Sequence, residues 1–170
     1  MDFFKVLENR HSIRNYLSRP VERTKLERIL AAAASAPSAC NLQSYDIFIV
    51  TKVKQRSALA KAACGQGFVL VAPVVLVFCT NSRNAERFGA RARNFYALQD
   101  ATIACSYAQL AATAQGLGSC WVGAFEPDEV RAVLGVGKEH EPVAILPIGY
   151  ISGKPEIKEH LPPSELTHTL

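Results

Sequence analysis

Hydrophobic side chains recur every three or four residues in several parts of this chain, and elsewhere they form short continuous runs. The first spacing places side chains on one face of a helix, whereas short apolar runs rich in β-branched residues are typical of buried strands. The expected helices cover residues 3–9, 22–34, 55–63, 96–115 and 127–134. The expected strands cover residues 46–51, 74–80, 120–124 and 142–150. Helices that alternate with about four strands predict a three-layer α/β or α+β domain.

Three segments lack this regular pattern. The segment that holds Arg10, Ser12 and Arg14 alternates like an extended chain, so these three side chains should point the same way. Residues 84–95 are polar and basic, and both a helix and a mobile lid are compatible with them. Residues 151–170 have too little periodicity to build a core, so we expect an extended C-terminal arm that wraps over another surface, such as a second subunit.

The longest expected helix has a face of small side chains, which allow another element to approach closely. This face comprises Ala101, Ala104, Cys105, Ala108, Ala111 and Ala112. The pattern fits either a central helix or a helix at a dimer interface.

The composition favours one domain that spans residues 1–170. Hydrophobic residues make up 49% of the chain and charged residues 20%, a surplus of apolar surface that predicts an obligate oligomer. The net charge of +4 suits an anionic small molecule. Because the lysines and arginines are dispersed, we expect no nucleic-acid partner.

The five cysteines are widely spaced and include no C-x-x-C pair, so we expect no metal site, iron–sulfur cluster or disulfide framework. The longest apolar run, Val69–Cys79, is too short to span a bilayer and contains Pro73. The amino terminus lacks the basic start and cleavage site of a signal peptide. We therefore expect a cytoplasmic protein without membrane contact.

The run Arg10-His11-Ser12-Ile13-Arg14 has the donors that a phosphate group requires. Two guanidinium groups offer forked N–H donors, and the serine adds a neutral hydroxyl. The alternative is structural: Arg10 would lie at a helix carboxyl end, where the dipole favours a cation, and Arg14 would be an ordinary surface residue. His11 fits a surface or packing position better than an acid–base role.

Two further segments are suited to a flat polar ligand. Residues 37–43 form a loop between an expected helix and strand, and their amide and hydroxyl groups can read a ring edge, although such residues are also ordinary turn formers. Gly118 and Gly123 let backbone N–H groups approach a ring closely, and Trp121 offers an aromatic face or a core side chain. This segment lacks the arrangement of a dinucleotide-binding fingerprint. No nucleophile–base pair or metal-ligand spacing is evident, so a cofactor would supply the chemistry of any enzyme here.

Taken in order, these segments resemble the nitroreductase family of FMN-dependent oxidoreductases, and the resemblance covers nearly the whole chain. The matching pieces are Arg10-x-Ser12-x-Arg14-x-Tyr16, Ala36-Pro37-Ser38-Ala39-x-Asn41-x-Gln43, Ala72-Pro73-Val74-Val75, Gly116-Leu-Gly118-Ser-Cys-Trp121-Val-Gly123 and Ile148-Gly149-Tyr150. The resemblance implies an α+β fold with a central mixed or antiparallel sheet between helices. It also implies an intertwined homodimer with two FMN molecules at the subunit interface.

The resemblance also implies which residues contact the cofactor. The first arginine segment and Lys158 would hold the phosphate end, the 37–43 loop of the other subunit would reach the isoalloxazine ring, and the backbone from Gly118 to Gly123 would lie near its reactive edge. No side chain is expected to be catalytic in itself. The full set of expected contacts is Arg10, His11, Ser12, Arg14, Pro37, Ser38, Ala39, Asn41, Gln43, Gln66, Gly118, Trp121, Val122, Gly123 and Lys158.

The chain departs from the family pattern in three places. Gln43-Ser44-Tyr45 replaces the frequent Gln-Pro-Trp, and the tail lacks the Arg-Lys-Pro phosphate clamp, for which Lys158 or His160 is the candidate substitute. The chain is also short, so residues 84–95 would replace the insertion that often covers the substrate.

The implied function is transfer of electrons from NADH or NADPH to an electron-poor acceptor, such as a nitroaromatic or a quinone, by a ping-pong mechanism. Arg87, Arg91 or Arg93 are candidates for the nucleotide phosphates, although a solvated basic helix face explains these residues better. Three alternatives stay open: another FMN-dependent reaction such as dehydrogenation or dehalogenation, a non-catalytic flavin-binding redox sensor, and a basic interaction module without a cofactor.

Overall fold

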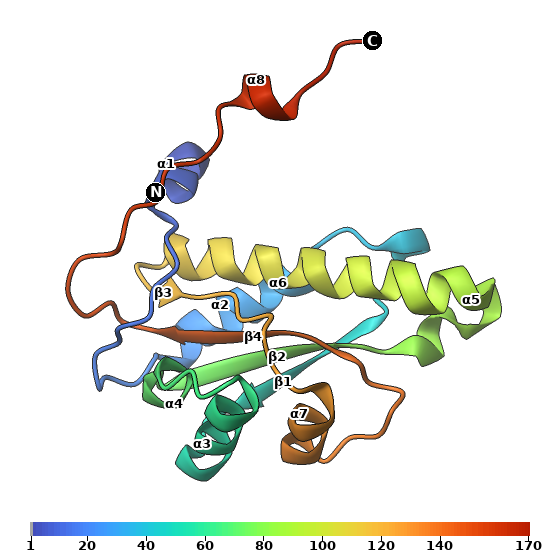
Figure 1. Cartoon of the computed structure of the whole chain (residues 1–170), viewed down its shortest axis with the longest axis horizontal. Helices are drawn as coiled ribbons and strands as arrows, with labels where there is room; N and C mark the ends of the chain where they lie inside the picture. Colours follow the sequence, from blue (N-terminus) through green and yellow to red (C-terminus); the bar gives the residue numbers. More distant parts are fainter. Residues whose placement is uncertain (1) are drawn as a thin grey trace.

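A computed structural model describes residues 2–170, in which the central sheet has four antiparallel strands in the order β1-β2-β4-β3 (Figure 1). The strands are β1 (Tyr45–Val50), β2 (Val74–Thr80), β3 (Gly118–Ser119) and β4 (Pro142–Gly149). β2 and β4 lie in the middle, and every residue of β2 is buried, as its continuous apolar sequence predicts. The predicted strands at 46–51, 74–80 and 142–150 are therefore confirmed to within one residue.

Helices cover both faces of the sheet and create two hydrophobic cores. On one face, α2 (Arg23–Ala34) and α6 (Ala97–Ala114) pack against side chains of β2 and β4 such as Leu76 and Leu146. On the other face, α3 (Val53–Ala62), α4 (Phe68–Val71) and α7 (Pro127–Leu134) pack against the alternate side chains, such as Val77 and Ile145. This arrangement is the expected three-layer α+β architecture.

The small residues of α6 make it a central helix. Ala104, Cys105, Ala108 and Ala112 belong to the core between α6 and the sheet, and all four are fully buried. Small side chains at these positions allow the helix backbone to lie close to the large residues of β2, including Phe78.

The strand predicted for residues 120–124 is wrong, because strand pairing in this region is confined to β3 and a single bridge. Gly118 and Ser119 pair with β4, and Ser119 also accepts a backbone hydrogen bond from Ile13 at 2.9 Å. Beyond them only Val122 exchanges backbone hydrogen bonds with Ile145, both at 3.0 Å. The chain then leaves the sheet toward α7.

Residues 82–96 resolve the choice between a helix and a lid in favour of helical structure. A 3₁₀ segment (Ser82–Phe88), a single turn α5 (Gly89–Arg91) and a π-helical turn (Ala92–Tyr96) follow one another and lead into α6. Gly89 joins the first two pieces with a φ of +84°, a conformation that glycine adopts without strain.

Two segments near the ends of the chain, residues 10–16 and 150–152, lie side by side at the β3 edge of the sheet (Figure 1). After α1 (Phe3–Asn9) the chain runs extended to Tyr16, which bridges Ile151 at the start of the arm. Ser152 also donates a backbone hydrogen bond to Asn15 at 3.0 Å. The arm then passes α1 and ends in the short helix α8 (Pro163–Leu166), which its sequence did not predict. Within residues 2–170, each helix is too short or too polar to cross a bilayer.

Gly118 provides a test of how the extended segment is held. A Cβ atom there would lie 2.7 Å from Cγ1 of Ile13, whereas one at Gly123 would meet only the Trp121 ring, at 3.5 Å from Nε1 and 3.9 Å from Cδ1. Gly118→Ala should lower the free energy of unfolding by about 1–3 kcal/mol through overpacking, measured by urea denaturation. The control Gly123→Ala should change it by less than about 0.5 kcal/mol. Equal effects of the two substitutions would contradict this packing.

Candidate functional site

The segment after α1 and the C-terminal arm together line a small cavity of about 130 Å³. We call its lining the basic cradle; it comprises Arg10, His11, Ser12, Arg14, Glu156, Lys158 and His160. The extended backbone presents the first four of these residues, and the pairing of Tyr16 with Ile151 brings the arm alongside them. The predicted contacts Arg10, His11, Ser12 and Arg14 are therefore brought together with Lys158, although nearly 150 residues separate them in sequence.

The charges of the cradle are unbalanced. In residues 2–170, neither Arg10 nor Arg14 forms an ion pair with a carboxylate, and the guanidinium of Arg14 lies 5.9 Å from the centre of the Phe68 ring. The single acidic residue of the lining, Glu156, pairs with Lys158 at 3.6 Å, with both side chains largely exposed. Two free guanidinium groups beside a hydroxyl form a donor set that fits a phosphate group.

The buried Cys120 thiol is influenced by the same basic residues. Burial raises the pKa of the Cys120 thiol, while the neighbouring Arg14, the Ser12 hydroxyl and Arg10 oppose that rise. The adjacent Ser119, which bridges Ser12, has a buried hydroxyl without a hydrogen-bond partner in the described part of the chain. The positive charges of Arg14 and Arg10 therefore also act on the Cys120 thiol.

The 37–43 loop adopts a conformation that non-glycine residues rarely take. Cys40, Asn41 and Gln43 have φ values of +50°, +55° and +49°. Each such residue costs roughly 1–3 kcal/mol and persists only where surrounding contacts impose it. One of these contacts is local: the Ser38 Oγ accepts a hydrogen bond from the Gln43 N–H at 3.0 Å.

The main support of this loop is Asp100, which the sequence analysis did not single out. Its carboxylate is 2% exposed and accepts hydrogen bonds from the N–H groups of Ala39, at 2.9 Å, and Ser44, at 3.3 Å. These two donors lie on either side of the three residues with positive φ. The signal was present in the sequence, because Asp100 is the one acidic residue among the buried positions of α6, which otherwise hold alanine, cysteine and threonine.

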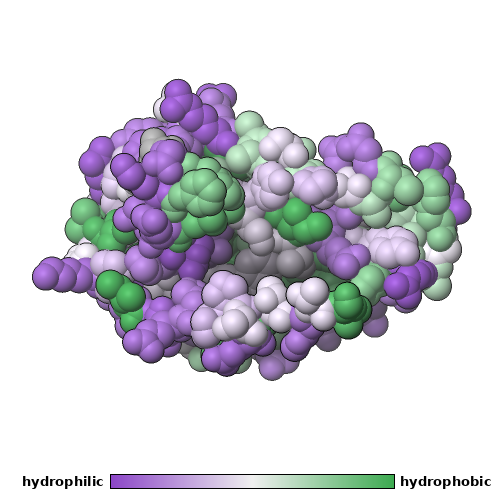
Figure 2. Space-filling model, turned by 90° about the horizontal axis from the view of Figure 1, so that it is seen from above, coloured by the Kyte–Doolittle hydropathy of each residue, from purple (hydrophilic) through white to green (hydrophobic). Residues whose placement is uncertain are grey.

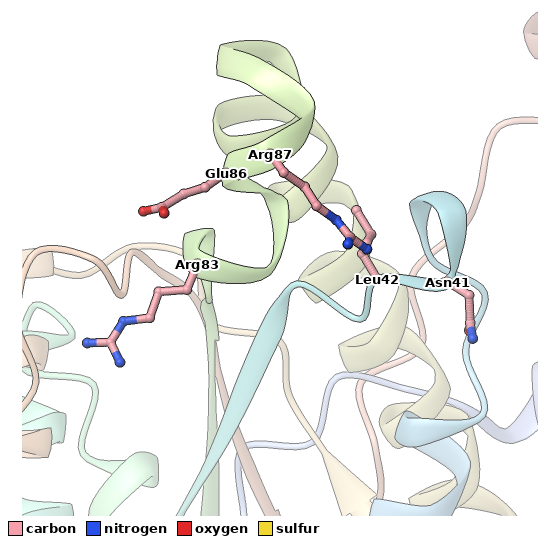
Figure 3. A pocket seen from close by; sticks show the side chains of 5 residues that line it. All are labelled: Asn41, Leu42, Arg83, Glu86 and Arg87. Atoms are coloured by element: carbon pink, nitrogen blue, oxygen red, sulfur yellow. The ribbon is translucent and has the colours of Figure 1, made fainter.

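An open cleft of about 850 Å³ separates this loop from the 3₁₀ segment that follows β2, and Figure 3 shows it. Asn41 and Leu42 line one side, and Arg83, Glu86 and Arg87 line the other. Arg87 reaches toward Leu42, whereas Arg83 points away and pairs with Glu139 at 3.5 Å. The guanidinium of Arg87 lies 4.9 Å from the centre of the Phe88 ring, and within residues 2–170 Arg87 forms no ion pair with a carboxylate.

The remaining predicted residues lie around the end of β3. Val122 is buried in the sheet, Trp121 is partly buried against the α6 core, and Gly123 is exposed. Gln66 donates from Nε2 to the carbonyl oxygens of Ala63, at 3.0 Å, and Ala124, at 3.3 Å, so it ties the glycine turn to this segment.

Within this one chain the loop and the basic cradle line different cavities. Pro37, Ser38, Ala39, Asn41 and Gln43 are thus not brought to the predicted phosphate contacts by one copy alone.

Comparison with known proteins identifies the family. The sequence profile of the Nitroreductase family matches residues 7–71 and 63–150, and the chain belongs to this family. A Thermus thermophilus protein named NADH dehydrogenase is 35% identical over 169 residues, covering 83% of this chain and 82% of the relative. A Bacillus subtilis protein named FMN reductase (NAD(P)H) is 29% identical, covering 98% of this chain and 73% of the relative.

Solved structures agree with this assignment. B. megaterium NfrA2 superposes with a TM-score of 0.92 at 27% identity, covering 99% of this chain and 74% of that one. A nitroreductase family protein from Clostridium novyi NT gives a TM-score of 0.82 at 29% identity, covering 89% and 86%. The predicted fold and family are therefore confirmed.

Proposed function

We propose that this chain, an NAD(P)H oxidoreductase of the nitroreductase family that uses FMN, passes electrons to an electron-poor acceptor such as a nitroaromatic or a quinone, in a ping-pong cycle. FMN, when bound, accepts hydride from the nicotinamide nucleotide and returns the electrons to the acceptor. The observation that carries the proposal is the basic cradle, whose free guanidinium groups fit the phosphate of this cofactor.

In this proposal the residues of the basic cradle bind and orient the phosphate of FMN. Arg10 and Arg14, which line the cavity, would donate forked hydrogen bonds to the phosphate oxygens, and the Ser12 hydroxyl would donate a further one. Lys158 supplies an ammonium group from the arm, which lines the same cavity. A phosphate would also draw Lys158 away from Glu156, because a dianion attracts the ammonium more strongly than a solvated carboxylate does.

The ring end of the cofactor lies against backbone in this proposal. Gly123 is exposed and Trp121 flanks it, so the Gly123 backbone is accessible to a planar ligand, whereas the Val122 N–H is already bonded to Ile145. Fixed backbone donors stabilise negative charge on such a ring without a change in their own protonation state. No acid–base side chain is therefore required.

A second copy of the chain would supply the 37–43 loop to this ring. The arm and the first helix expose large apolar side chains in a single copy, including Phe4 at 73% and Ile157 at 77% exposure. Figure 2 shows the face that carries α1 and the arm, with apolar patches between strongly polar ones and a hollow beside them. Apolar surface of this kind favours association. A homodimer would cover it and bring the loop of one copy to the cradle of the other.

The open cleft beside Asn41 would receive the substrates. Arg87 is its unpaired cation, so we propose that it attracts the phosphates of the nicotinamide nucleotide. Arg83 is a weaker candidate, because Glu139 already pairs with it. The alternative function is a flavin-binding sensor that does not turn over substrate. The cleft favours an enzyme over this sensor, because a sensor needs no opening for a substrate.

Arg10→Ala should weaken FMN binding by about 1.5–3 kcal/mol, the contribution of a charge-assisted hydrogen bond, which corresponds to a loss of about tenfold or more. Quenching of FMN fluorescence during titration measures this dissociation constant. Arg23→Ala is the control, because Arg23 is an exposed arginine on α2 that pairs with Glu27. Unchanged affinity in the Arg10 variant would contradict the assignment of the phosphate site.

The ping-pong cycle predicts two separable half-reactions. Under anaerobic conditions NADH or NADPH alone should bleach the flavin absorbance, and subsequent addition of a nitroaromatic or a quinone should restore it. Stopped-flow absorbance measures both steps. A flavin that stays oxidised with both nucleotides would support the sensor and exclude the proposed turnover.

Arg87→Ala should raise KM for the nicotinamide nucleotide several-fold, because a cation that attracts its phosphates is lost, and should leave the FMN dissociation constant unchanged. Arg93→Ala on the adjacent π-helical turn is a matched control in which a basic side chain is removed outside the cleft lining. If both substitutions raise KM equally, the effect is one of overall charge and Arg87 has no specific role.

A further inference from the structure

The 37–43 loop is held by the carboxylate of Asp100, which the proposed reaction does not use. Asp100 stands in the first turn of α6 with its carboxylate buried beneath the loop. Its Oδ1 accepts from the Ala39 N–H and its Oδ2 from the Ser44 N–H, so the two oxygens connect the two ends of the loop. A single side chain thereby fixes the distance between the backbones of Ala39 and Ser44.

Burial of a carboxylate is unfavourable unless its hydrogen bonds compensate. In the described part of the chain no cation pairs with Asp100, and its recorded hydrogen bonds go to these two backbone N–H groups. The charge acts beyond the loop, because burial and then Asp100 raise the pKa of Tyr45. An alanine at this position would continue the small-residue face of α6, so helix packing alone does not explain an acidic residue here.

The residues between the two contacts have the unfavourable backbone. Cys40, Asn41 and Gln43 all have positive φ, and Ser38 Oγ supports the turn through the Gln43 N–H. Strained residues of this kind concentrate at binding and catalytic sites, where neighbouring contacts over-determine them. In Figure 3 the same turn holds Asn41 and Leu42 at the edge of the open cleft.

We infer that Asp100 is a positioning residue that preorganises the 37–43 loop to receive the isoalloxazine ring. This inference rests on the proposed function, since it takes the loop to be the ring contact. The carboxylate acts through the backbone: it holds the Ala39 and Ser44 N–H groups inward, so that the side chains between them face outward in one conformation. Preorganisation of this kind reduces the ordering that a ligand must impose when it binds.

Asp100→Asn tests the inference, because the amide keeps the shape and one acceptor but replaces the other with a donor that opposes an N–H. We expect the dissociation constant for FMN to rise at least tenfold. We also expect the visible circular dichroism of bound FMN to change, because it reports the asymmetric surroundings of the ring. Ser38→Ala, which removes the second support of the loop, should change both quantities in the same direction and to a smaller extent. If Asp100→Asn does not fold, Asp100→Ala takes its place with the same expected changes, because alanine continues the small-residue face of α6.

Val130→Ala is the stability control. Val130 is fully buried on α7, across the sheet from the loop, so its truncation should lower the thermal midpoint without touching the loop. If this variant weakens FMN binding as much as Asp100→Asn does, Asp100 has only a general structural role. Wild-type affinity and an unchanged flavin spectrum in both loop variants would likewise overturn the inference. Absence of FMN binding by the wild-type protein would be a different result, since it would refute the proposed function itself.

Discussion

The pairing of two terminal segments at one edge of the sheet is the constraint on which the candidate site depends. The Ile13 N–H donates to the Ser119 carbonyl, and the Tyr16 hydroxyl shares its one hydrogen between the carbonyl oxygens of Ile13, at 2.6 Å, and Pro147, at 3.2 Å. Burial strongly raises the pKa of this tyrosine, so its hydroxyl stays a donor throughout the ordinary pH range. These bonds fix the extended segment, and that segment presents Arg10 and Arg14 on its open side.

Glycine makes that pairing possible. A Cβ atom at Gly149 would lie 2.7 Å from Pro73 and 3.0 Å from the Tyr16 ring, and one at Gly118 would overlap Ile13. The glycine-rich segments at the ends of β3 and β4 therefore have a packing requirement that exists whether or not a cofactor is bound. A role in contacting a flavin would be additional to it.

Much of this arrangement was predictable from residue patterns. Three of the four strands, the main helices and the arginine segment follow from hydrophobic spacing and from the donor chemistry of Arg10, Ser12 and Arg14. The strand at 120–124 was mispredicted because its apolar residues resemble a strand, while the pairing that decides the matter lies at Gly118 and Ser119, against distant residues. The short helices α4 and α8 were missed because four residues carry too little periodicity.

The candidate site was less predictable than the fold for a physical reason. The place of Lys158 beside Arg10 depends on a bridge between Tyr16 and Ile151, which no local pattern encodes. Asp100 was overlooked because its role lies in two backbone hydrogen bonds to a loop about 60 residues away in sequence. Contacts between residues far apart in sequence thus set the geometry of the basic cradle and of the 37–43 loop. The sequence indicates mainly the chemistry of their side chains.

The central claim is that the basic cradle of one copy and the loop of another hold a single FMN. A crystal structure of the protein grown with FMN tests this most directly. The account predicts the phosphate within hydrogen-bond distance of Arg10 and Arg14, and the ring against residues 38–43 of a second copy. A phosphate bound elsewhere, or a flavin enclosed within one copy, would contradict it.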